Sequence, residues 1–370
     1  MDEPRLAVSK TIPEITVVVP TFNERGNVER LAARLAAALS GRRWEAIFVD
    51  DDSPDGTAAL LREIGARDPR IRCIRRVGRR GLAGACIEGM LAAQASVVAV
   101  IDADLQHDET VLPGMLAAIE GGADIVVATR YAGGGEAASF SAARGAISRA
   151  ATLASRLLLR VPSSDPMSGF FMLRRAVIEE VAPKLSTQGF KILLDILASV
   201  PPGLKVAELP YAFGTRMSGA SKLDNRVMVD FIGLLLSKMT GGAISMRFIS
   251  FLAVGGLGLV VHIAVLRAAL IGDTSFTAAQ TLATIVAMTF NFFLNNMLTY
   301  RDHRLTGWRL LPGLLTFYAV CGLGAIANIG LGSWVFIETS RWWVAGLAGS
   351  IVGAVWNYLS STTLVWKSRP

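Results

Sequence analysis

Four long apolar stretches in the second half of the chain place the strongest constraint on how it can fold. They run over about residues 247–271, 276–299, 311–336 and 343–366. A helix needs about 20 apolar residues to cross the hydrocarbon layer of a bilayer, and each stretch reaches that length. Backbone groups in lipid must be hydrogen-bonded within their own element. We therefore predict an all-α domain of four transmembrane helices.

The charges between these stretches predict their orientation. Arg301, Arg304 and Arg309 lie in the middle connection, and Lys367 and Arg369 follow the last stretch. Connections rich in arginine and lysine stay on the cytoplasmic side of the membrane. The N-terminus has no apolar core of a signal peptide. We therefore expect an integral protein of the plasma membrane with the first half of the chain and both termini in the cytoplasm.

The membrane half also contains an internal repeat, which a shift of 66 residues makes visible. The shift aligns similar residues, namely Phe251–Gly258 with Phe317–Gly324, Asn291 with Asn357, and Tyr300 with Trp366. Such self-similarity predicts two helical hairpins of like orientation. The glycines indicate closely packed helices, and the asparagines are expected to bond between helices.

The first half has the composition of a soluble domain. Although 52% of all residues are apolar, charged and apolar segments alternate up to about residue 225. The net charge of +7 suits lipid headgroups and phosphorylated substrates, and no nucleic-acid-binding motif is present. Cys73, Cys86 and Cys321 are too few and too widely spaced for a disulfide framework or a zinc site, so we expect free, buried thiols. Residues 1–13 read as a flexible tail.

Strands and helices alternate through this half. Apolar, β-branched runs predict strands at about 15–20, 44–49, 71–74, 96–101 and 124–128. Helical spacing predicts intervening helices, among them 24–39, with Asn23 as its cap, 83–93 and 113–120. This alternation predicts an α/β domain with a Rossmann-like, mostly parallel sheet.

Three polar turns follow strands of this predicted sheet, namely Pro20–Glu24, Asp50–Asp55 and Asp102–Gln106. The carboxyl ends of parallel strands share one edge, where such folds bind ligands. Carboxylates are costly to desolvate without a partner, so a divalent metal carrying a phosphorylated ligand is the expected occupant. No glycine-rich dinucleotide fingerprint or Walker motif is present, which disfavours dehydrogenases and P-loop ATPases.

The residues of these turns carry a resemblance to a known family. Val19–Glu24, Val49–Thr57 and Asp102–His107 resemble the nucleotide-sugar signature of inverting GT-A glycosyltransferases, most closely the polyprenyl- or dolichol-phosphate mannose synthase group. Further similar motifs are Thr129–Tyr131, Arg144–Gly145, Asp165–Phe170, Gly189–Lys191, Glu208–Tyr211 and Arg216–Leu223. One departure is Ala83, where the family pattern leads us to expect glycine.

The resemblance implies a domain plan and a set of site residues. The plan is a GT-A domain over 14–225, an interfacial helix or linker over 226–246, and a GtrA-like membrane domain with two hairpin repeats over 247–370. The implied nucleotide-sugar residues are Pro20, Phe22, Glu24, Val49, Asp51, Asp102, Ala103, Asp104, Lys191, Arg216 and Lys222. Those implied for the acceptor phosphate are Arg130, Arg144 and Ser148, and Asp102, Asp104 and Gln106 are implied for Mg²⁺ or Mn²⁺. Asp104, Arg130 and Arg216 would be catalytic.

The function that this resemblance implies is transfer of a hexose to a membrane lipid phosphate with inversion. Mannose from GDP-mannose is the expected donor group, and a dolichyl or undecaprenyl phosphate is the expected acceptor. Transfer from UDP-glucose or a UDP-amino sugar is the alternative, followed by a lipid flippase with a degenerate transferase domain. A processive polysaccharide synthase is disfavoured, because no Gln-x-x-Arg-Trp motif precedes the membrane stretches.

Two basic, amphipathic segments join the halves. They cover residues 139–160 and 225–238 and combine leucines at helical spacing with arginine or lysine. Helices of this kind lie in the membrane interface or pack on a soluble core, and both alternatives stay open from the sequence.

Overall fold

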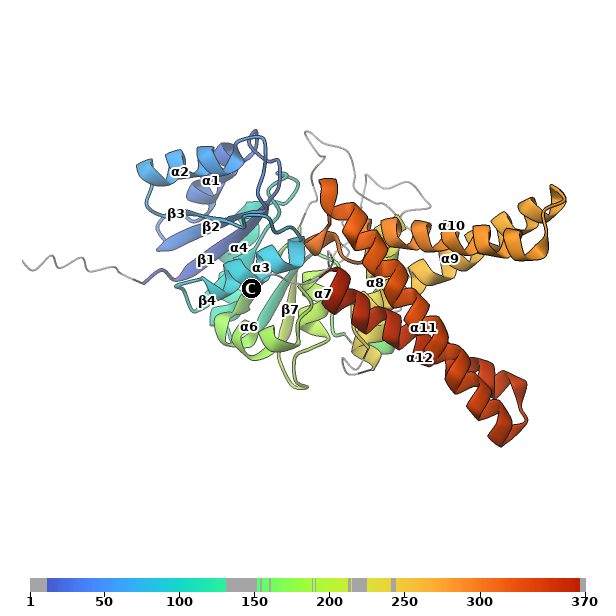
Figure 1. Ribbon diagram of the computed structural model, residues 1–370. Helices are drawn as coiled ribbons and strands as arrows, with labels where there is room; N and C mark the ends of the chain where they lie inside the picture. Colours follow the sequence, from blue (N-terminus) through green and yellow to red (C-terminus); the bar gives the residue numbers. More distant parts are fainter. Residues whose placement is uncertain are drawn as a thin grey trace, which may run out of the picture. The chain divides into compact units, whose positions relative to one another are not determined.

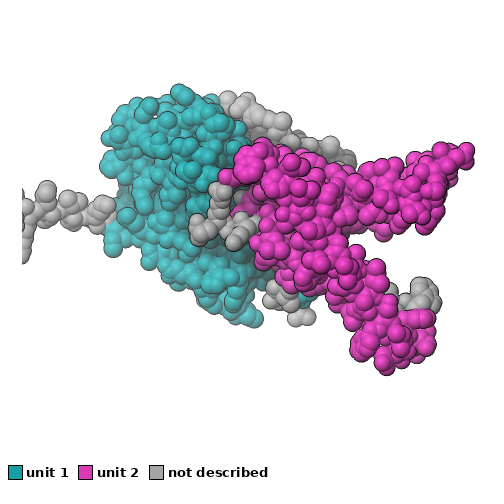
Figure 2. All heavy atoms as spheres, viewed as in Figure 1, with its two compact units in different colours: residues 1–242 teal, residues 243–370 magenta. Residues whose placement is uncertain are grey.

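The computed structural model divides the chain into two compact units, residues 1–242 and 243–370, called here the N-terminal unit and the C-terminal unit (Figures 1 and 2). The structure describes residues 12–130, 152–153, 155–159, 161–187, 189, 191–211, 214, 225–240 and 244–366.

The N-terminal unit is built on a seven-stranded sheet with the order β3-β2-β1-β4-β6-β5-β7 (Figure 1). The strands are β1 Ile15–Thr21, β2 Trp44–Asp50, β3 Ile71–Arg75, β4 Val97–Val100, β5 Ile125–Thr129, β6 Phe171–Arg174 and β7 Val206–Pro210. Only β6 runs antiparallel, between β4 and β5, and every other pairing is parallel. The predicted mostly parallel, Rossmann-like sheet of the GT-A type is confirmed.

Helices connect the strands, and the sheet is buried on both sides. The described helices of this unit are α1 Val28–Ala38, α2 Thr57–Arg67, α3 Leu82–Leu91, α4 Leu112–Glu120, α6 Arg175–Val181, α7 Ile192–Leu197 and α8 Asn225–Met239, with short 3-10 helices at Glu109–Val111 and Ala182–Lys184. Consecutive residues Val17 and Val18 of β1 are both fully buried. Side chains alternate between the two faces of a strand, so both faces of the sheet are covered, as in other parallel sheets.

The start of α1 corrects one sequence prediction. Asn23 does not cap this helix, which begins at Val28 with Asn27 in the capping position. Asn23 has a φ of 61° and belongs to the turn after β1. Asparagine tolerates this left-handed conformation better than most residues, which explains why an asparagine stands in this turn although it does not cap the helix.

The antiparallel β6 brings a further segment to the edge where β1, β2 and β4 end. Because β6 runs opposite to its neighbours, its first residue lies at this edge, and the segment 161–170 that precedes it arrives there as well. β5 and β7 end at the same edge, with Thr129 opposite Pro210. Segments far apart in sequence therefore meet at one edge.

The C-terminal unit consists of helices α9 Met246–Ile271, α10 Phe276–Met297, α11 Leu310–Thr339 and α12 Trp342–Ser360, with short helical turns at Arg301–His303, Gly307–Arg309 and Ser361–Val365. Three helical segments among the described residues are long and apolar enough to cross a membrane, namely Arg247–Ile271, Phe276–Met297 and Gly307–Thr339. The 19-residue α12 is not among them, and polar Asn357 and Tyr358 lie in its last turns. The fourth span therefore stays a prediction.

The two hairpins of this unit, α9–α10 and α11–α12, repeat one packing detail. A Cβ atom added to Gly258 of α9 would overlap the side chain of Asn291 on α10. A Cβ atom added to Gly324 of α11 would likewise overlap Asn357 on α12. The 66-residue shift relates these two contacts to each other. In each hairpin the absence of a side chain at the glycine lets the partner helix approach so closely that its asparagine packs against the glycine.

An aromatic cluster between the hairpins has approximate two-fold symmetry. The rings of Tyr300 and Trp366, which the shift makes equivalent, stack with centroids 4.2 Å apart and an interplanar angle of 3°. Phe251 lies 5.7 Å from Tyr358, and the equivalent pair, Phe317 and Phe292, lies 5.8 Å apart. Equivalent residues meet one another only near a two-fold axis. The hairpins are thus packed as a pseudo-dimer around the Tyr300–Trp366 stack.

Candidate active site

The turns after β1, β2 and β4 each contain one non-glycine residue with a left-handed backbone. These residues are Asn23, Asp52 and Leu105, with φ values of 61°, 57° and 60°. Such conformations persist where the surrounding structure enforces them, and they are common at ligand sites. The first two turns are bonded together, since the Asn23 amide donates to Ser53 Oγ at 3.0 Å. The edge therefore carries three tightly formed turns.

Asp51 after β2 is held by a buried arginine that the sequence did not bring to attention. One of its carboxylate oxygens accepts from Arg76 Nη1, and the other accepts from the Gly81 amide at 2.6 Å. The Arg76 side chain is 6% exposed and also bonds Glu88. Burial raises the pKa of Asp51, and the bonds from Gly81 and Arg76 oppose that rise.

The signal for this pair was present in the strand register. β2 and β3 pair in parallel with Asp50 opposite Arg75, so the next residue of each strand, Asp51 and Arg76, are neighbours. An acid and a base that follow two adjacent strands are expected to meet, but only once the strand pairing is known.

Four more of the residues predicted for the nucleotide sugar lie in or directly after β1 and β2. Pro20 and Val49 are opposite each other in β1 and β2, and both are buried. The Arg80 guanidinium lies 4.5 Å from the centre of the Phe22 ring. Glu24 accepts a 2.7 Å hydrogen bond from Asn27 Nδ2. The structure thus brings these predicted residues to the ends of β1 and β2.

The turn after β4 presents Asp102, Asp104 and Gln106 at the same edge. Asp102 Oδ2 accepts from His107 Nε2 at 3.2 Å, and Asp104 Oδ1 accepts from the Gln106 amide at 3.2 Å. Gln106 Nε2 donates to the Gly214 carbonyl at 3.1 Å. Ala103, between the two acids, is buried at 3% exposure. The turn is therefore fixed by bonds along itself and to a residue after β7.

This donor set fits a hard divalent cation. Two carboxylates and one amide oxygen are oxygen ligands of the kind that Mg²⁺ uses, with substrate phosphates and water completing its shell. Within the described ranges, no three His, Cys, Asp or Glu side chains converge on a common point. The turn can therefore supply part of a metal shell, and the rest would come from a phosphorylated ligand.

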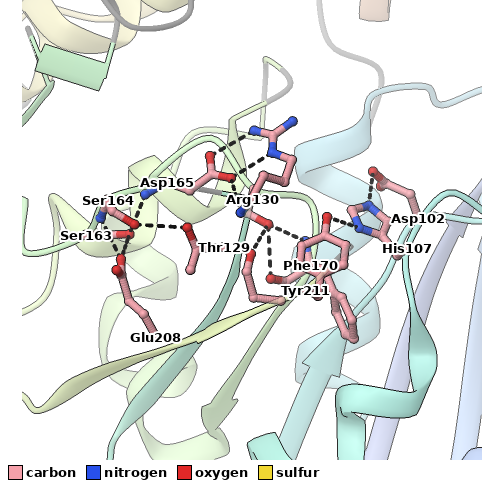
Figure 3. Close-up of polar contacts among 12 residues, drawn as sticks. Asp102, His107, Thr129, Arg130, Ser163, Ser164, Asp165, Phe170, Glu208 and Tyr211 are labelled. Atoms are coloured by element: carbon pink, nitrogen blue, oxygen red, sulfur yellow. Dashed lines mark hydrogen bonds and ion pairs between the residues drawn. The ribbon is translucent and has the colours of Figure 1, made fainter. Parts of the chain in front are cut away.

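Arg130, which follows β5, is locked into a two-bond pair with Asp165. Its Nε and Nη2 atoms donate to the two carboxylate oxygens at 2.7 and 2.8 Å (Figure 3). Asp165 is fully buried, and the Arg130 side chain is 14% exposed. The segment that carries Asp165 is held in turn by Glu208, which accepts from Ser163 Oγ at 2.7 Å. The plane of the guanidinium is consequently fixed.

Lys191 links this arginine to the acidic turn. It is the residue before α7 and is half-buried. Burial lowers the pKa of Lys191 and the charge of Arg130 lowers it further, whereas Asp165 and Asp102 raise it. Lys191 therefore lies within electrostatic reach of both the Arg130–Asp165 pair and Asp102.

Four predicted site residues, Arg144, Ser148, Arg216 and Lys222, lie outside the described residues.

Ala83, where the family pattern led us to expect glycine, lies in α3 with a side chain that is 2% exposed. The neighbouring glycine is the constrained one, because a Cβ atom on Gly84 would come 2.6 Å from Arg76 Nη2. The thiols of Cys73, Cys86 and Cys321 are free, and only Cys86 is fully buried, so the predicted burial holds for Cys86 alone.

Comparisons with known proteins match both units. Residues 16–182 match glycosyl transferase family 2, and residues 250–366 match the GtrA/DPMS transmembrane domain. The chain is 33% identical over 358 residues to a dolichol-phosphate mannosyltransferase of Pyrococcus furiosus, an alignment that covers 96% of this chain and 100% of the relative.

Other relatives match a little more than half of the chain. The dolichol-phosphate mannosyltransferase of Saccharomyces cerevisiae is 35% identical and covers 59% of this chain and 84% of its own length. The polyprenol monophosphomannose synthase of Mycolicibacterium smegmatis is 33% identical and covers 56% and 80%. A solved structure of glucosyl-3-phosphoglycerate synthase from Mycobacterium tuberculosis with Mn²⁺, UDP-glucose and glycerol 3-phosphate has a TM-score of 0.44 and 22% identity, covering 62% of this chain and 80% of that one.

Proposed function

The chain belongs to the dolichol-phosphate mannosyltransferase family, and from this premise we propose that it transfers mannose from GDP-mannose to the phosphate of a membrane polyprenol. The observation that carries the proposal is the match to the Pyrococcus furiosus enzyme over 96% of the chain, because it spans the transferase unit and the membrane unit together. The product would be a lipid-linked mannose with inverted configuration at the anomeric carbon.

The donor side of the reaction is assigned to the turns after β1, β2 and β4. Pro20, Phe22, Glu24, Val49 and Asp51 would hold the base and ribose, at the strand ends where the structure gathers them. Asp102, Asp104 and Gln106 would hold Mg²⁺ or Mn²⁺, and Ala103 would contact the nucleotide sugar. The metal would supply Lewis-acid stabilisation of the charge that develops on the leaving nucleoside diphosphate.

The acceptor side is assigned to arginines. A lipid monophosphate has a second pKa near 6, so it is largely dianionic at neutral pH and already a nucleophile. Arg130, with its plane fixed by Asp165, would orient this phosphate, and Arg144 and Ser148 would assist. Lys191, Arg216 and Lys222 would neutralise the phosphates between donor and acceptor. A phosphate oxygen then forms a bond to the anomeric carbon as the bond to the diphosphate breaks on the opposite face.

In this arrangement, catalysis depends on how the two substrates are oriented and on how their negative charges are neutralised. The acceptor needs no general base, because its phosphate is already deprotonated. Holding two anionic substrates in line is opposed by their mutual repulsion, and cations between them offset that repulsion. Asp104, Arg130 and Arg216 are therefore our candidates for the catalytic residues.

The C-terminal unit would hold the enzyme in the membrane and receive the polyprenyl chain. We assign four spans to it, with α12 continuing through the turn Ser361–Val365 to reach membrane-spanning length. The matched GtrA/DPMS transmembrane domain, which includes both hairpins, supports this assignment. The positive charges at Arg301, Arg304 and Arg309 favour a cytoplasmic position for the catalytic unit, in the plasma membrane.

A panel of donors tests the proposal. Purified full-length protein is incubated with a polyprenyl phosphate and with GDP-mannose, UDP-glucose or a UDP-amino sugar, and both the lipid product and the released nucleotide are measured. We expect mannosyl lipid and one GDP per mannose transferred. Transfer from a UDP-sugar alone would establish the alternative donor. Lipid movement across a vesicle without nucleotide release would favour the flippase alternative.

A further inference from the structure

His107 lies between Asp102 and Tyr211 in a buried chain of hydrogen bonds. Its Nε2 atom is 3.2 Å from Asp102 Oδ2, and its Nδ1 atom is 2.7 Å from the Tyr211 hydroxyl (Figure 3). The imidazole is 5% exposed. The Phe170 ring meets it edge-on, with centroids 5.5 Å apart. Aromatic side chains thus enclose a polar ring whose two nitrogens both have partners.

The chemistry of the partners sets the direction of this chain. An ionised carboxylate only accepts hydrogen bonds, so His107 Nε2 carries the proton that is donated to Asp102. In a neutral imidazole the other nitrogen accepts, and Nδ1 therefore accepts a hydrogen bond from the Tyr211 hydroxyl. Burial raises the pKa of Tyr211, which keeps that proton in place. Tyr211 donates to His107, and His107 donates to Asp102.

Of the three hydrogen-bonded residues, Asp102 is the one whose side chain is partly exposed to solvent. Its side chain is 35% exposed, whereas that of His107 is 5% exposed. A Cβ atom added to Gly169 would overlap Asp102 Oδ2, the same oxygen that bonds His107, so the backbone before β6 packs closely against it. One carboxylate oxygen of Asp102 is therefore bonded to His107 and lies close to the Gly169 backbone, while the side chain as a whole is partly exposed.

We propose that His107 is a positioning residue that holds Asp102 by one carboxylate oxygen, so that the carboxylate presents a fixed edge to the divalent cation and diphosphate of the donor. The inference rests on the proposed function, since it needs Asp102 to face that metal. A half-exposed aspartate is otherwise free to rotate. Hydrogen bonds to ligating carboxylates orient them and commonly change metal affinity by about 10- to 100-fold.

The support comes from the part of the chain that follows β5. Phe170 and Gly169 precede β6, and Tyr211 follows β7. The antiparallel insertion of β6 therefore has a consequence for the site. The segment before β6 brings Gly169 and Phe170 to the turn, and the end of β7 brings Tyr211, although the turn lies about 60 to 100 residues earlier in the chain.

The test compares three variants of the full-length enzyme in detergent. His107→Phe keeps the aromatic volume and removes both nitrogens, His107→Gln keeps a side-chain N–H donor, and Tyr211→Phe removes one oxygen. Binding of Mn²⁺ in the presence of GDP is followed by the electron paramagnetic resonance signal of free Mn²⁺. The KM for polyprenyl phosphate and the thermal midpoint are measured on the same samples.

We expect His107→Phe to weaken Mn²⁺ binding by about 10- to 100-fold. His107→Gln should recover most of that loss. Tyr211→Phe should cost several-fold, because the imidazole loses the hydrogen bond at Nδ1 that helps to hold the ring in place. The KM for the acceptor should stay the same. A purely packing role predicts the opposite pattern, in which His107→Phe is harmless and His107→Gln is damaging, and that result would overturn the proposal.

Three further outcomes are decisive. If His107→Phe yields no folded protein, Tyr211→Phe decides, and Mn²⁺ binding equal to wild type overturns the proposal. If the wild-type enzyme transfers mannose but binds no Mn²⁺ with GDP, both the metal assignment and this inference are wrong. If the wild-type enzyme binds Mn²⁺ with GDP and the variants bind it equally well, this inference is wrong and the proposed function is unaffected.

Discussion

At the scale of single residues, the pairing of Arg130 with Asp165 changes how the arginine motif is understood. The sequence offered Arg130 as a cation for a phosphate. In the structure, the fully buried carboxylate of Asp165 accepts hydrogen bonds from the Nε and Nη2 atoms of Arg130. A bidentate pair of this kind fixes the plane of the guanidinium, so its direction is set before a phosphate arrives. Because the guanidinium is already oriented, the entropic cost of binding the phosphate is smaller.

Removing the charge of Asp165 should therefore affect the acceptor more than the donor. We expect Asp165→Asn to raise the KM for polyprenyl phosphate at least tenfold with little change in the KM for GDP-mannose. Loss of a buried ion-pair partner should also lower the free energy of unfolding by about 3 kcal/mol. Steady-state kinetics with each substrate varied, together with chemical denaturation, measure both effects.

Asp124→Asn is the matched control. Asp124 lies just before the other end of β5, and its ion pair with Arg174 is 3.5 Å long and partly exposed. Exposed pairs contribute less than about 1 kcal/mol, and this one is away from the site. Equal kinetic effects of the two substitutions would contradict the role given to the Arg130–Asp165 pair.

Lys191 predicts a pH dependence. Burial and the charge of Arg130 lower its pKa from the ordinary value of 10.5. As pH rises through the lowered pKa the ammonium loses its proton, so the attraction for the donor phosphates is lost at a lower pH than for an exposed lysine. We expect kcat/KM for GDP-mannose, which reports the free enzyme, to fall on the alkaline side below pH 10.5.

Lys191→Arg should remove this alkaline decline, because arginine keeps its charge throughout. The kcat/KM of the variant at neutral pH shows whether the larger side chain is tolerated. A decline at the same pH in wild type and variant would assign the titration to another group. Lys191→Met should be poor at every pH, since the charge is then absent throughout.

The residues that local sequence could predict are those that follow a strand directly. Asp51, Asp102 and Asp104 are recognisable because an apolar run ends in acids, and the sheet edge that they share follows from parallel pairing. Their supporting partners are not recognisable in this way. Arg76 directly follows the neighbouring strand β3, and Tyr211 is 104 residues away from His107. Gly169 belongs to the motif Asp165–Phe170, but it has no side chain that would predict its contact with Asp102. Such partners are decided by long-range packing.

At the scale of elements, the same limit explains which strands were found. The five predicted strands are apolar runs bounded by turns, and all five are present. β6 has only four residues and passes directly into α6, and the edge strand β7 is only half-buried. Neither presents a clear period-two pattern, and their places in the sheet depend on β4 and β5, which pair with them.

The hairpins of the C-terminal unit permit a prediction with an internal control. A Cβ atom at Gly258 or Gly324 would overlap the asparagine that packs against it, whereas Gly256 and Gly322 have no neighbour within 4 Å. The 66-residue shift relates the members of each pair. We expect Gly258→Ala and Gly324→Ala each to cost about 1 to 3 kcal/mol of stability, because overpacking pushes the helices apart.

Gly256→Ala and Gly322→Ala should be neutral or mildly stabilising, because alanine favours helix by up to about 1 kcal/mol over glycine. Thermal unfolding of the four purified variants in one detergent makes the comparison. Two-fold packing also predicts that the Gly258 and Gly324 variants lose similar amounts. A large loss in only one hairpin would show that the repeat is not equivalent in stability.

At the scale of the whole molecule, α8 closes the N-terminal unit near the candidate site. Lys238 at its end bonds the buried Asp195 of α7 and donates to Ser199 Oγ at 2.7 Å. Burial raises the pKa of Asp195, and Lys238 opposes that rise. α7 begins directly after Lys191. The sequence left open whether this segment lies in the membrane interface or packs on the preceding domain. These contacts show that the C-terminal end of α8 packs on the rest of the N-terminal unit.

The two units differ in what each contributes to activity, and truncation separates these contributions. The N-terminal unit has its own sheet and core, so residues 1–242 should keep the candidate site. We expect this fragment to transfer mannose to a short, water-soluble polyprenyl phosphate at a rate within several-fold of the full-length enzyme. On a long-chain acceptor in vesicles its activity should fall at least 100-fold, because enzyme and lipid no longer share one surface.

Fusing residues 1–242 to a single unrelated transmembrane helix decides why the long-chain activity is lost. An anchor concentrates any enzyme at the membrane, so full recovery would mean that the C-terminal unit only retains the enzyme there. Partial recovery with a raised KM for long chains would mean that the paired hairpins also bind the polyprenyl tail. Equal activity of the unanchored fragment on short and long acceptors would contradict both roles. We expect partial recovery, because a lone anchor lacks the Tyr300–Trp366 stack that holds two hairpins together.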